Sequence, residues 1–242
     1  MSRSISVDSL LAGNASLMPA KSEEVGLQNI SLGELCISLT RGVSISSEML
    51  MFYNACDFSD IVAIGTGSYK DHELQLWNAT FLCQCLDEWK KGEVRPGDLL
   101  ISKTITPPKA FVMDFPEDAK VIADSNLFIL KLDTNRIDPV YLMAYLNTNE
   151  GQEQLKSKAA GNSRIKAIPI DGIRSLMIPV LPMNDQKELA VKFTDKIRSL
   201  KYLKEQLEVV EDSLLDLYSN GYTPDNSAPP HVFKIMEREL EL

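Results

Sequence analysis

The 242-residue chain has little of the material from which metal sites, disulfide frameworks and membrane spans are built. Of its four cysteines, Cys83 and Cys85 lie close together but have no second pair that would complete a zinc site. His72 and His231 are the only histidines. No run of eighteen apolar residues occurs, and the serine-broken start of the chain does not have the pattern of a secretion signal. We therefore expect no metal, no cofactor and no membrane span, and reduced thiols in a cytoplasmic protein.

Catalytic motifs are also missing. The glycine cluster Gly65-Thr66-Gly67 lacks the further glycine and the strand–helix context of a nucleotide-binding loop. The acid-x-lysine pattern of Asp118-Ala119-Lys120 recurs at two other places, so it carries little information. No serine–histidine or cysteine–histidine pair has a supporting context. The sequence predicts a protein that is not an enzyme and has no catalytic residues.

The most informative segment is residues 178–219. Pro179 and Pro182 bound an apolar stretch that suits an exit strand and not a helix interior. A long helix is expected to follow, with Asn184 or Asp185 as its N-cap. Its apolar positions repeat at heptad spacing and form a predicted dimer seam: Phe193, Leu200, Leu203, Leu207, Val210, Leu214 and Leu217.

The charges along this helix oppose its dipole. Residues 187–204 carry six bases and two acids, and residues 205–216 carry five acids and no base. A helix dipole favours the reverse order by about 0.3–1 kcal/mol per charge. A second, antiparallel copy would place each basic half beside an acidic half, so the pattern predicts an antiparallel homodimer. The alternative is an amphipathic helix that folds on its own domain and leaves its polar face in solvent.

The net charge of −9 argues against a simple nucleic-acid binder, but the charge is unevenly distributed. Residues 156–174 carry five bases and one acid, and residues 99–113 contain Lys103 and Lys109 and no acid. A local positive field can neutralise phosphates on a protein that is acidic overall. Either window alone is more typical of a solvated loop.

The order of elements predicts a mixed, β-rich α+β domain followed by the long helix. Apolar runs separated by turn residues predict strands at 61–64, 80–86, 99–102, 109–113 and 127–132. Helices are expected from Asp138-Pro139 onward and near 150–158. The expected organisation is a loose lead-in over 1–25, a domain over 26–182, the helix over 183–219, and a flexible tail over 220–242 with a candidate short helix at 231–242.

Several strings occur in an order that is more specific than any one of them. The first of them is Leu32-Gly33-Glu34-Leu35, followed by Arg41-Gly42. The middle of the chain contains Pro96-Gly97-Asp98-Leu99-Leu100-Ile101, then Asn126-Leu127-Phe128-Ile129-Leu130 and the Tyr141-Leu142 helix. After these come Gly161, Ile168, Ile173 and the string IPVLPMNDQKELA at 178–190. In this order the chain resembles the specificity (S) subunit of type I restriction-modification systems. The resemblance covers residues 27–217 and corresponds to a half-length form, with one target-recognition domain and one spacer helix.

This resemblance implies a noncatalytic, sequence-specific DNA-binding subunit. Its implied partners are double-stranded DNA, an adenine-N6 methyltransferase (modification) subunit and, where the system has one, a restriction subunit. Two antiparallel copies would rebuild the two-domain arrangement and read an inverted, bipartite site. The alternative is a truncated protein-interaction module that pairs with other specificity subunits and modulates their targeting.

Two groups of side chains in the domain have the chemistry for DNA contacts. The expected phosphate contacts combine charge with short donors on a glycine-containing loop: Lys158, Asn162, Ser163, Arg164 and Lys166. The expected base-reading side chains come from two other loops: Ser68, Tyr69, Lys70, Thr104, Thr106 and Lys109. The alternative for each of them is an ordinary surface loop.

Overall fold

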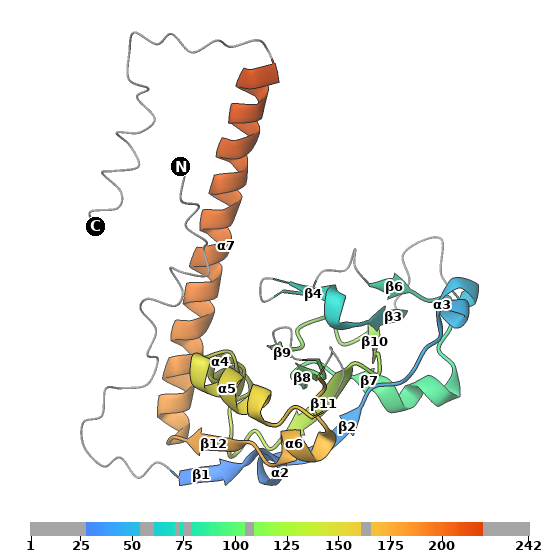
Figure 1. The fold of residues 1–242 in the computed structure, drawn as a ribbon, viewed down its shortest axis with the longest axis vertical. Coiled ribbons are helices and arrows are strands. Elements are labelled where there is room, and N and C mark those ends of the chain that lie inside the picture. The colour runs from blue at the N-terminus through green and yellow to red at the C-terminus, as the bar shows by residue number, and fades with distance from the viewer. Residues whose placement is uncertain are drawn as a thin grey trace. The chain divides into compact units, whose positions relative to one another are not determined.

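The structure is a computed structural model that describes residues 28–53, 61–70, 73–74, 79–104, 109–160 and 166–219. The chain divides into two compact units, residues 1–197 and 198–242, and the helix α7 (Met183–Ser219) runs across the boundary between them (Figure 1). The predicted lead-in over 1–25 and the predicted tail over 220–242, with its candidate helix, lie outside the described residues. The predicted fold class, a β-rich α+β domain with a long C-terminal helix, is confirmed.

The first sheet of the domain is a four-stranded antiparallel sheet with the strand order β2-β11-β8-β9. Its strands are β2 (Cys36–Arg41), β11 (Leu127–Leu132), β8 (Leu99–Ser102) and β9 (Ala110–Val112). The central strand β11 is an almost continuous apolar run, as expected for a strand with both faces covered. Its alternate residues enter different cores: Phe128 and Leu130 join the larger core, and Leu127 and Ile129 join the second one.

The second four-stranded sheet has the order β6-β3-β10-β7, in which β3 and β10 are parallel. Its strands are β6 (Thr80–Phe81), β3 (Ile61–Ile64), β10 (Lys120–Ala123) and β7 (Glu93–Val94). Trp89, from the 3₁₀ helix η3 (Asp87–Gly92), is buried beside Ile122, and the helix α3 (Ser47–Tyr53) packs on the same cluster through Met49, Leu50 and Tyr53. The short helix η1 (Thr66–Ser68) and the pair β4 (Tyr69–Lys70) and β5 (Glu73–Leu74) follow β3.

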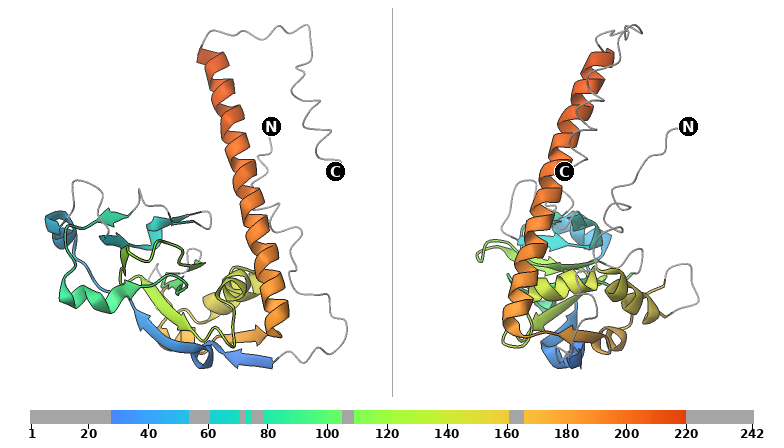
Figure 2. Two further views of the ribbon diagram at one scale, coloured as in Figure 1. Left: turned by 180° about the vertical axis from the view of Figure 1, so that it is seen from behind. Right: turned by 90° about the vertical axis from the view of Figure 1, so that its left-hand side faces the viewer.

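A two-stranded ribbon joins the two ends of the domain. The strand β1 (Gln28–Ser31) pairs antiparallel with β12 (Met177–Val180), and the short helices α2 (Leu32–Leu35) and α6 (Ile170–Arg174) lie beside them. The helices α4 (Pro139–Leu146) and α5 (Asn149–Ser157) complete the first unit, and both views of Figure 2 show α4 next to the first turns of α7. Leu189 and Ala190 of α7 belong to the same core as Tyr141 and Leu142 of α4. The ribbon and α4 therefore form the base on which α7 begins.

Two element boundaries differ from the sequence-based expectation. The strand expected over 80–86 ends at Phe81. The Leu82 N–H still donates to the carbonyl of Ile61, the next residue in register on β3, but the Cys83 N–H donates to the Tyr53 carbonyl at the end of α3, outside the sheet. The helix α7 begins at Met183, so Asn184 and Asp185 lie inside its first turn and are not the N-cap. Among the described residues, no helix is long and apolar enough to cross a membrane.

Gly42 allows the turn after β2 to pass close to the end of β10. A Cβ atom at this position would overlap the backbone carbonyl oxygens of Ala123 and Asp124. We expect Gly42→Ala to lower the free energy of unfolding by about 1–3 kcal/mol, because backbone has to move to make room. Gly67→Ala is the matched control, since a Cβ at Gly67 meets nothing within 4 Å. Urea unfolding of the two variants measures the difference, and equal stabilities would contradict the close approach.

Candidate nucleic-acid interface

The loop between β8 and β9, residues 103–109, is at the centre of the candidate interface, and buried Ser102 closes its base. The backbone N–H of Ser102 donates to the Lys109 carbonyl (2.8 Å), and the Lys109 N–H donates to the Ser102 hydroxyl (2.7 Å). That hydroxyl in turn donates to the Thr104 carbonyl (3.3 Å). The two ends of the loop are therefore fixed, and the half-buried side chains of Thr104 and Lys109 start from a defined frame. Thr106 lies outside the described residues.

The loop that follows β3 lies on one side of this hairpin. The Lys109 ammonium donates to the Tyr69 carbonyl (2.8 Å), and the Tyr69 ring stacks on Phe111 with a centroid distance of 3.8 Å. Ser68 and Tyr69 are both buried, and the Ser68 hydroxyl accepts from the Gly65 N–H (3.2 Å). The side chains of Ser68 and Tyr69 thus hold the loop in place and are not presented to solvent. The side chain of Lys70 is not among the described atoms.

The basic loop after α5 lies on the other side of the hairpin. Thr104 forms an isolated antiparallel bridge with Ala167, and the Ile168 N–H donates to the Lys103 carbonyl (2.9 Å). Ala160 and Ala167 exchange backbone hydrogen bonds of 3.0 and 3.3 Å, so the two ends of this loop are drawn together. Lys166 is exposed, and Lys158 is half-buried at the C-cap of α5. The other expected phosphate contacts, Asn162, Ser163 and Arg164, lie outside the described residues.

The turn between β10 and β11 adds residues that the sequence reasoning missed. The Lys103 N–H donates to the Asn126 carbonyl (2.7 Å), and the Arg41 Nε donates to the Ser125 carbonyl (2.6 Å). Arg41 and Asn126 are exposed, and Lys103 is half-buried. The Asp124 carboxylate accepts from the Asn126 N–H (2.7 Å), so this acid is used within the turn. Arg41 reaches this position only because β2 pairs with β11, which a single sequence does not show.

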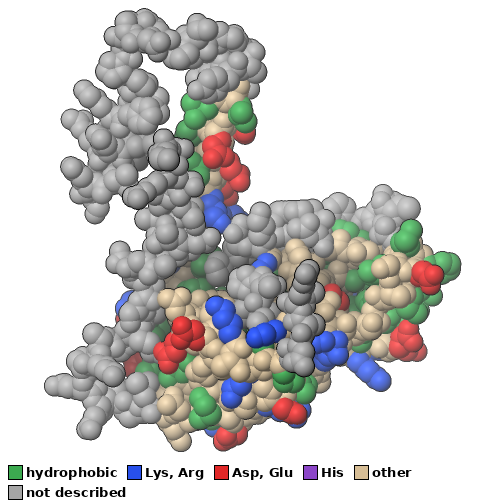
Figure 3. All heavy atoms as spheres, in the orientation of Figure 1, with side chains coloured by type: hydrophobic (Ala, Val, Ile, Leu, Met, Phe, Trp, Pro, Cys, Tyr) green, Lys and Arg blue, Asp and Glu red, His purple; other side chains and the backbone are tan. Residues whose placement is uncertain are grey.

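We call this assembly of the residue 65–70 loop, the 103–109 loop, the 160–167 loop and the 124–126 turn the reading edge. Its basic side chains come from separate segments, and Figure 3 shows Lys and Arg side chains at several separate places on the face of the domain drawn there. Among the described residues, no group of three His, Cys, Asp or Glu side chains is arranged to hold a metal ion. The arrangement supplies exposed cations and short hydroxyl and amide groups, which suit phosphates and base edges.

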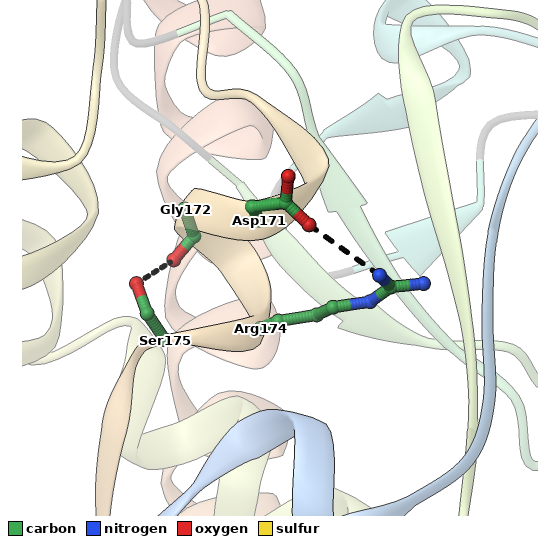
Figure 4. A network of polar contacts seen from close by, with 4 residues as sticks. All are labelled: Asp171, Gly172, Arg174 and Ser175. Carbon is green, nitrogen blue, oxygen red and sulfur yellow. Dashed lines mark hydrogen bonds and ion pairs between the residues drawn. The ribbon is translucent and has the colours of Figure 1, made fainter.

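The basic window at 156–174 is not a single patch. Arg174 lies on α6, where it forms an ion pair with Asp171 (3.4 Å), next to a Ser175 hydroxyl that donates to the Gly172 carbonyl (3.0 Å; Figure 4). A Cβ at Gly33 would lie 3.4 Å from the Arg174 Cβ, which places Arg174 beside α2. Burial raises the pKa of the nearby Cys36 thiol to about 12, against the opposing effect of the Arg174 charge. Arg174 therefore belongs to the base of the domain and not to the reading edge.

The structure also has known counterparts. No protein-family model and no curated protein matches the chain. A type I restriction-modification S subunit from M. genitalium superposes with a TM-score of 0.55 at 15% identity, over 80% of this chain and 45% of that chain. The HsdS subunit from Thermoanaerobacter tengcongensis gives a TM-score of 0.54 at 16% identity, over 85% of this chain and 52% of that one. The chain therefore has the fold of type I specificity subunits, as the resemblance predicted, and spans about half the length of these two.

The bond between Lys109 and the Tyr69 carbonyl should hold the residue 65–70 loop on the hairpin. We expect Lys109→Met, which keeps the length of the side chain, to lower stability by about 1 kcal/mol and to speed amide exchange over 65–69. Lys120→Met, at an exposed position of β10, is the control and should leave this exchange unchanged. Hydrogen exchange read by mass spectrometry without DNA is the measurement. Equal exchange in the two variants would show that the bond does not hold the loop.

Proposed function

We propose that the chain is a noncatalytic, sequence-specific DNA-binding subunit that directs an adenine-N6 methyltransferase to a bipartite site as an antiparallel homodimer. The observation that carries the proposal is the reading edge: loops expected from the sequence to contact DNA meet on one side of a domain that has the fold of type I specificity subunits. We also propose that the protein acts in the cytoplasm, where it would meet the DNA and the methyltransferase.

The residues of the reading edge fall into two groups, one proposed to contact phosphates and one proposed to contact bases. Arg41, Lys103, Lys158 and Lys166 are proposed to contact phosphates, with Asn162, Ser163 and Arg164 added on sequence grounds. Thr104, Lys109 and the exposed Asn126 are proposed to reach base edges, since an asparagine amide can pair with adenine and a lysine with guanine, with Lys70 and Thr106 added from the sequence. Ser68 and Tyr69 are buried, so they are assigned to supporting the loop.

Phosphate contacts predict a measurable dependence on salt. We expect Arg164→Ala/Lys166→Ala to weaken DNA binding about equally for all sequences and to reduce the slope of log affinity against log salt by about 1 for each phosphate that is no longer neutralised. Lys156→Ala, exposed on α5 outside the reading edge, is the control. Fluorescence anisotropy on duplexes selected from a randomised library gives both quantities. If the double variant binds like Lys156→Ala, the basic loop does not contact DNA.

The predicted dimer seam is exposed on the second unit. Leu203, Leu207, Val210 and Leu214 are all exposed large apolar side chains, whereas Phe193, in the first unit, is 8% exposed. The proposed seam therefore begins at Leu200, and the side chain of Leu217 is not among the described atoms. In an antiparallel register centred on Glu205, Leu200 faces Val210 and Leu203 faces Leu207. The same register places the basic stretch of each copy beside the acidic stretch of the other, so the interface is self-complementary.

Light scattering on the full chain tests this seam. We expect Leu207→Glu to convert the dimer to a monomer, because two carboxylates would be buried at the centre of the pair without partners. Leu215→Glu introduces the same change at a position that is more exposed (66% against 46%) and lies off the a/d positions, so it should remain dimeric. A monomeric wild-type chain, or dissociation by both substitutions alike, would contradict the proposed register.

The exposed seam also supports the second candidate function, an interaction module that pairs with other specificity subunits and alters their targeting. The acidic net charge of −9 favours the same reading, because it opposes independent tight binding to DNA. The salt-dependence experiment separates the two, since a module that only pairs would show no dependence on Arg164 and Lys166. The methyltransferase and any restriction subunit are proposed as partners in either case.

A further inference from the structure

Gln186, in the first turn of α7, is buried with 1% of its surface exposed, although glutamine normally lies at the surface. Its Nε2 donates to the carbonyls of Leu181 (2.8 Å) and Arg136 (3.1 Å), and its Oε1 accepts from the Asp138 N–H (2.8 Å). Leu181 follows β12, and Arg136 and Asp138 belong to the turn between β11 and α4. The side chain thus fastens the start of α7 to two other parts of the domain.

The turn that receives Gln186 is itself held on both sides. Asp138 is the N-cap of α4, where its Oδ1 accepts from the N–H groups of Val140 (2.8 Å) and Tyr141 (3.0 Å). The Arg136 guanidinium donates to the Glu34 carbonyl in α2 (2.7 Å). Gln186 therefore binds a segment that cannot move without disturbing two further helices.

The strand β12, which leads into α7, is fixed along both edges. One edge pairs with β1. Along the other, Gln154 donates to the Met177 carbonyl (3.0 Å) and accepts from its N–H (3.1 Å), and the Tyr141 hydroxyl donates to the Pro179 carbonyl (2.6 Å). Burial raises the pKa of Tyr141 to about 12, with a smaller contribution from Tyr145, so the hydroxyl remains a donor at neutral pH. The chain thus enters α7 from one defined position.

The buried hydrogen bonds of Gln186 fix the position of the first turn of α7 more narrowly than apolar packing can. Leu189 and Ala190 already supply apolar contacts between α7 and the core. Such contacts are non-directional, and a helix can adjust its rotation or its axial position while keeping most of them. A buried amide has to keep its partners at hydrogen-bonding distances and angles, or it is left unsatisfied. Gln186 accordingly permits one placement of the first turn.

The strand β11 connects the reading edge to the turn that binds Gln186. It begins directly after Asn126 and ends directly before the turn that binds Gln186. Six residues of strand span about 20 Å, and this strand is buried between the two cores. The reading edge and the start of α7 are therefore opposite ends of one well-packed element of the first unit.

Resting on the proposed function, we infer that Gln186 is a positioning residue: it fixes where α7 begins on the recognition domain, and thereby the number of base pairs between the two half-sites that a paired protein reads. It contacts no DNA in this role. Its replacement should change which spacings are accepted while the half-site sequences stay the same.

The experiment selects bound duplexes from a randomised library with the full-length chain and its variants, and sequencing gives the spacer length of each enriched inverted repeat. We expect the wild-type protein to prefer one spacer length. In Gln186→Ala the ratio of duplexes with that spacer length to duplexes one base pair longer or shorter should fall by about tenfold, while the half-site sequences stay unchanged. A tenfold change corresponds to the net contribution of about one hydrogen bond. Gln186→Met, which keeps the length of the side chain but can make none of the three hydrogen bonds, should show the same loss.

Lys187→Ala, at the exposed next position of the helix, is the control and should keep the wild-type spacing. Amide exchange at Asp138 and over 183–190 checks the loosening without DNA, and thermal unfolding checks that each variant is folded. If Gln186→Ala is not folded, Gln186→Met, which leaves a smaller cavity, carries the test. A wild-type spacing preference that survives in the folded variants overturns the positioning role alone. A wild-type chain that enriches no inverted repeat overturns the proposed function, and the spacing role with it.

Discussion

The burial of β11 on both faces is the constraint on which the rest of the first unit depends. Its alternate side chains enter two different cores, so the strand cannot shift by one residue without exchanging them. Pairing with β8 and β2 brings Lys103 and Arg41 to its beginning. Its end leads into the turn that caps α4 and receives Gln186. The loops that carry the candidate interface and the base of the long helix are thus placed by the same six residues.

At the reading edge, support of the loops falls mostly to other groups than those proposed to contact DNA, and Lys109 is assigned to both tasks. The loops are held together mainly by backbone hydrogen bonds and by buried side chains, such as the Ser102 hydroxyl and the Tyr69 ring stacked on Phe111. Exposed side chains such as Asn126 and Lys166 contribute little to that frame. Substitutions at exposed positions should therefore have small effects on stability, whereas a change at Ser102 or Tyr69 would disturb several loops at once.

Sequence patterns predicted those elements whose signal is local. Each of these signals lies within one continuous segment of sequence. They are the apolar runs of β3, β8 and β11, the Asp138-Pro139 start of α4 and the heptads of α7. The helix α3 was missed because its residues 49–53 are all apolar: Met51 and Phe52 are exposed, and their presence hides the helical spacing of Met49, Leu50 and Tyr53. The loops of the candidate site were found from charge and glycine content, but their meeting, and the part of Arg41 in it, depends on pairing between distant strands. Tyr69 was expected at a base edge because it lies on a predicted loop and carries a hydroxyl, and only the packing against Phe111 shows its ring to be buried.

The second unit combines two features that are each unfavourable in an isolated helix. Its apolar side chains from Leu203 to Leu215 are exposed, and its charges run against the helix dipole. The Glu188–Lys192 ion pair of the same helix lies in the first unit and is exposed on both sides, so it contributes little to stability. In the antiparallel register centred on Glu205, however, Leu200, Leu203, Leu207 and Val210 of the two copies cover each other, and the basic stretch meets the acidic one. Because an amphipathic helix folded on its own domain would need the seam but not the reversed charges, their occurrence on the same segment favours a second copy of this helix as its partner.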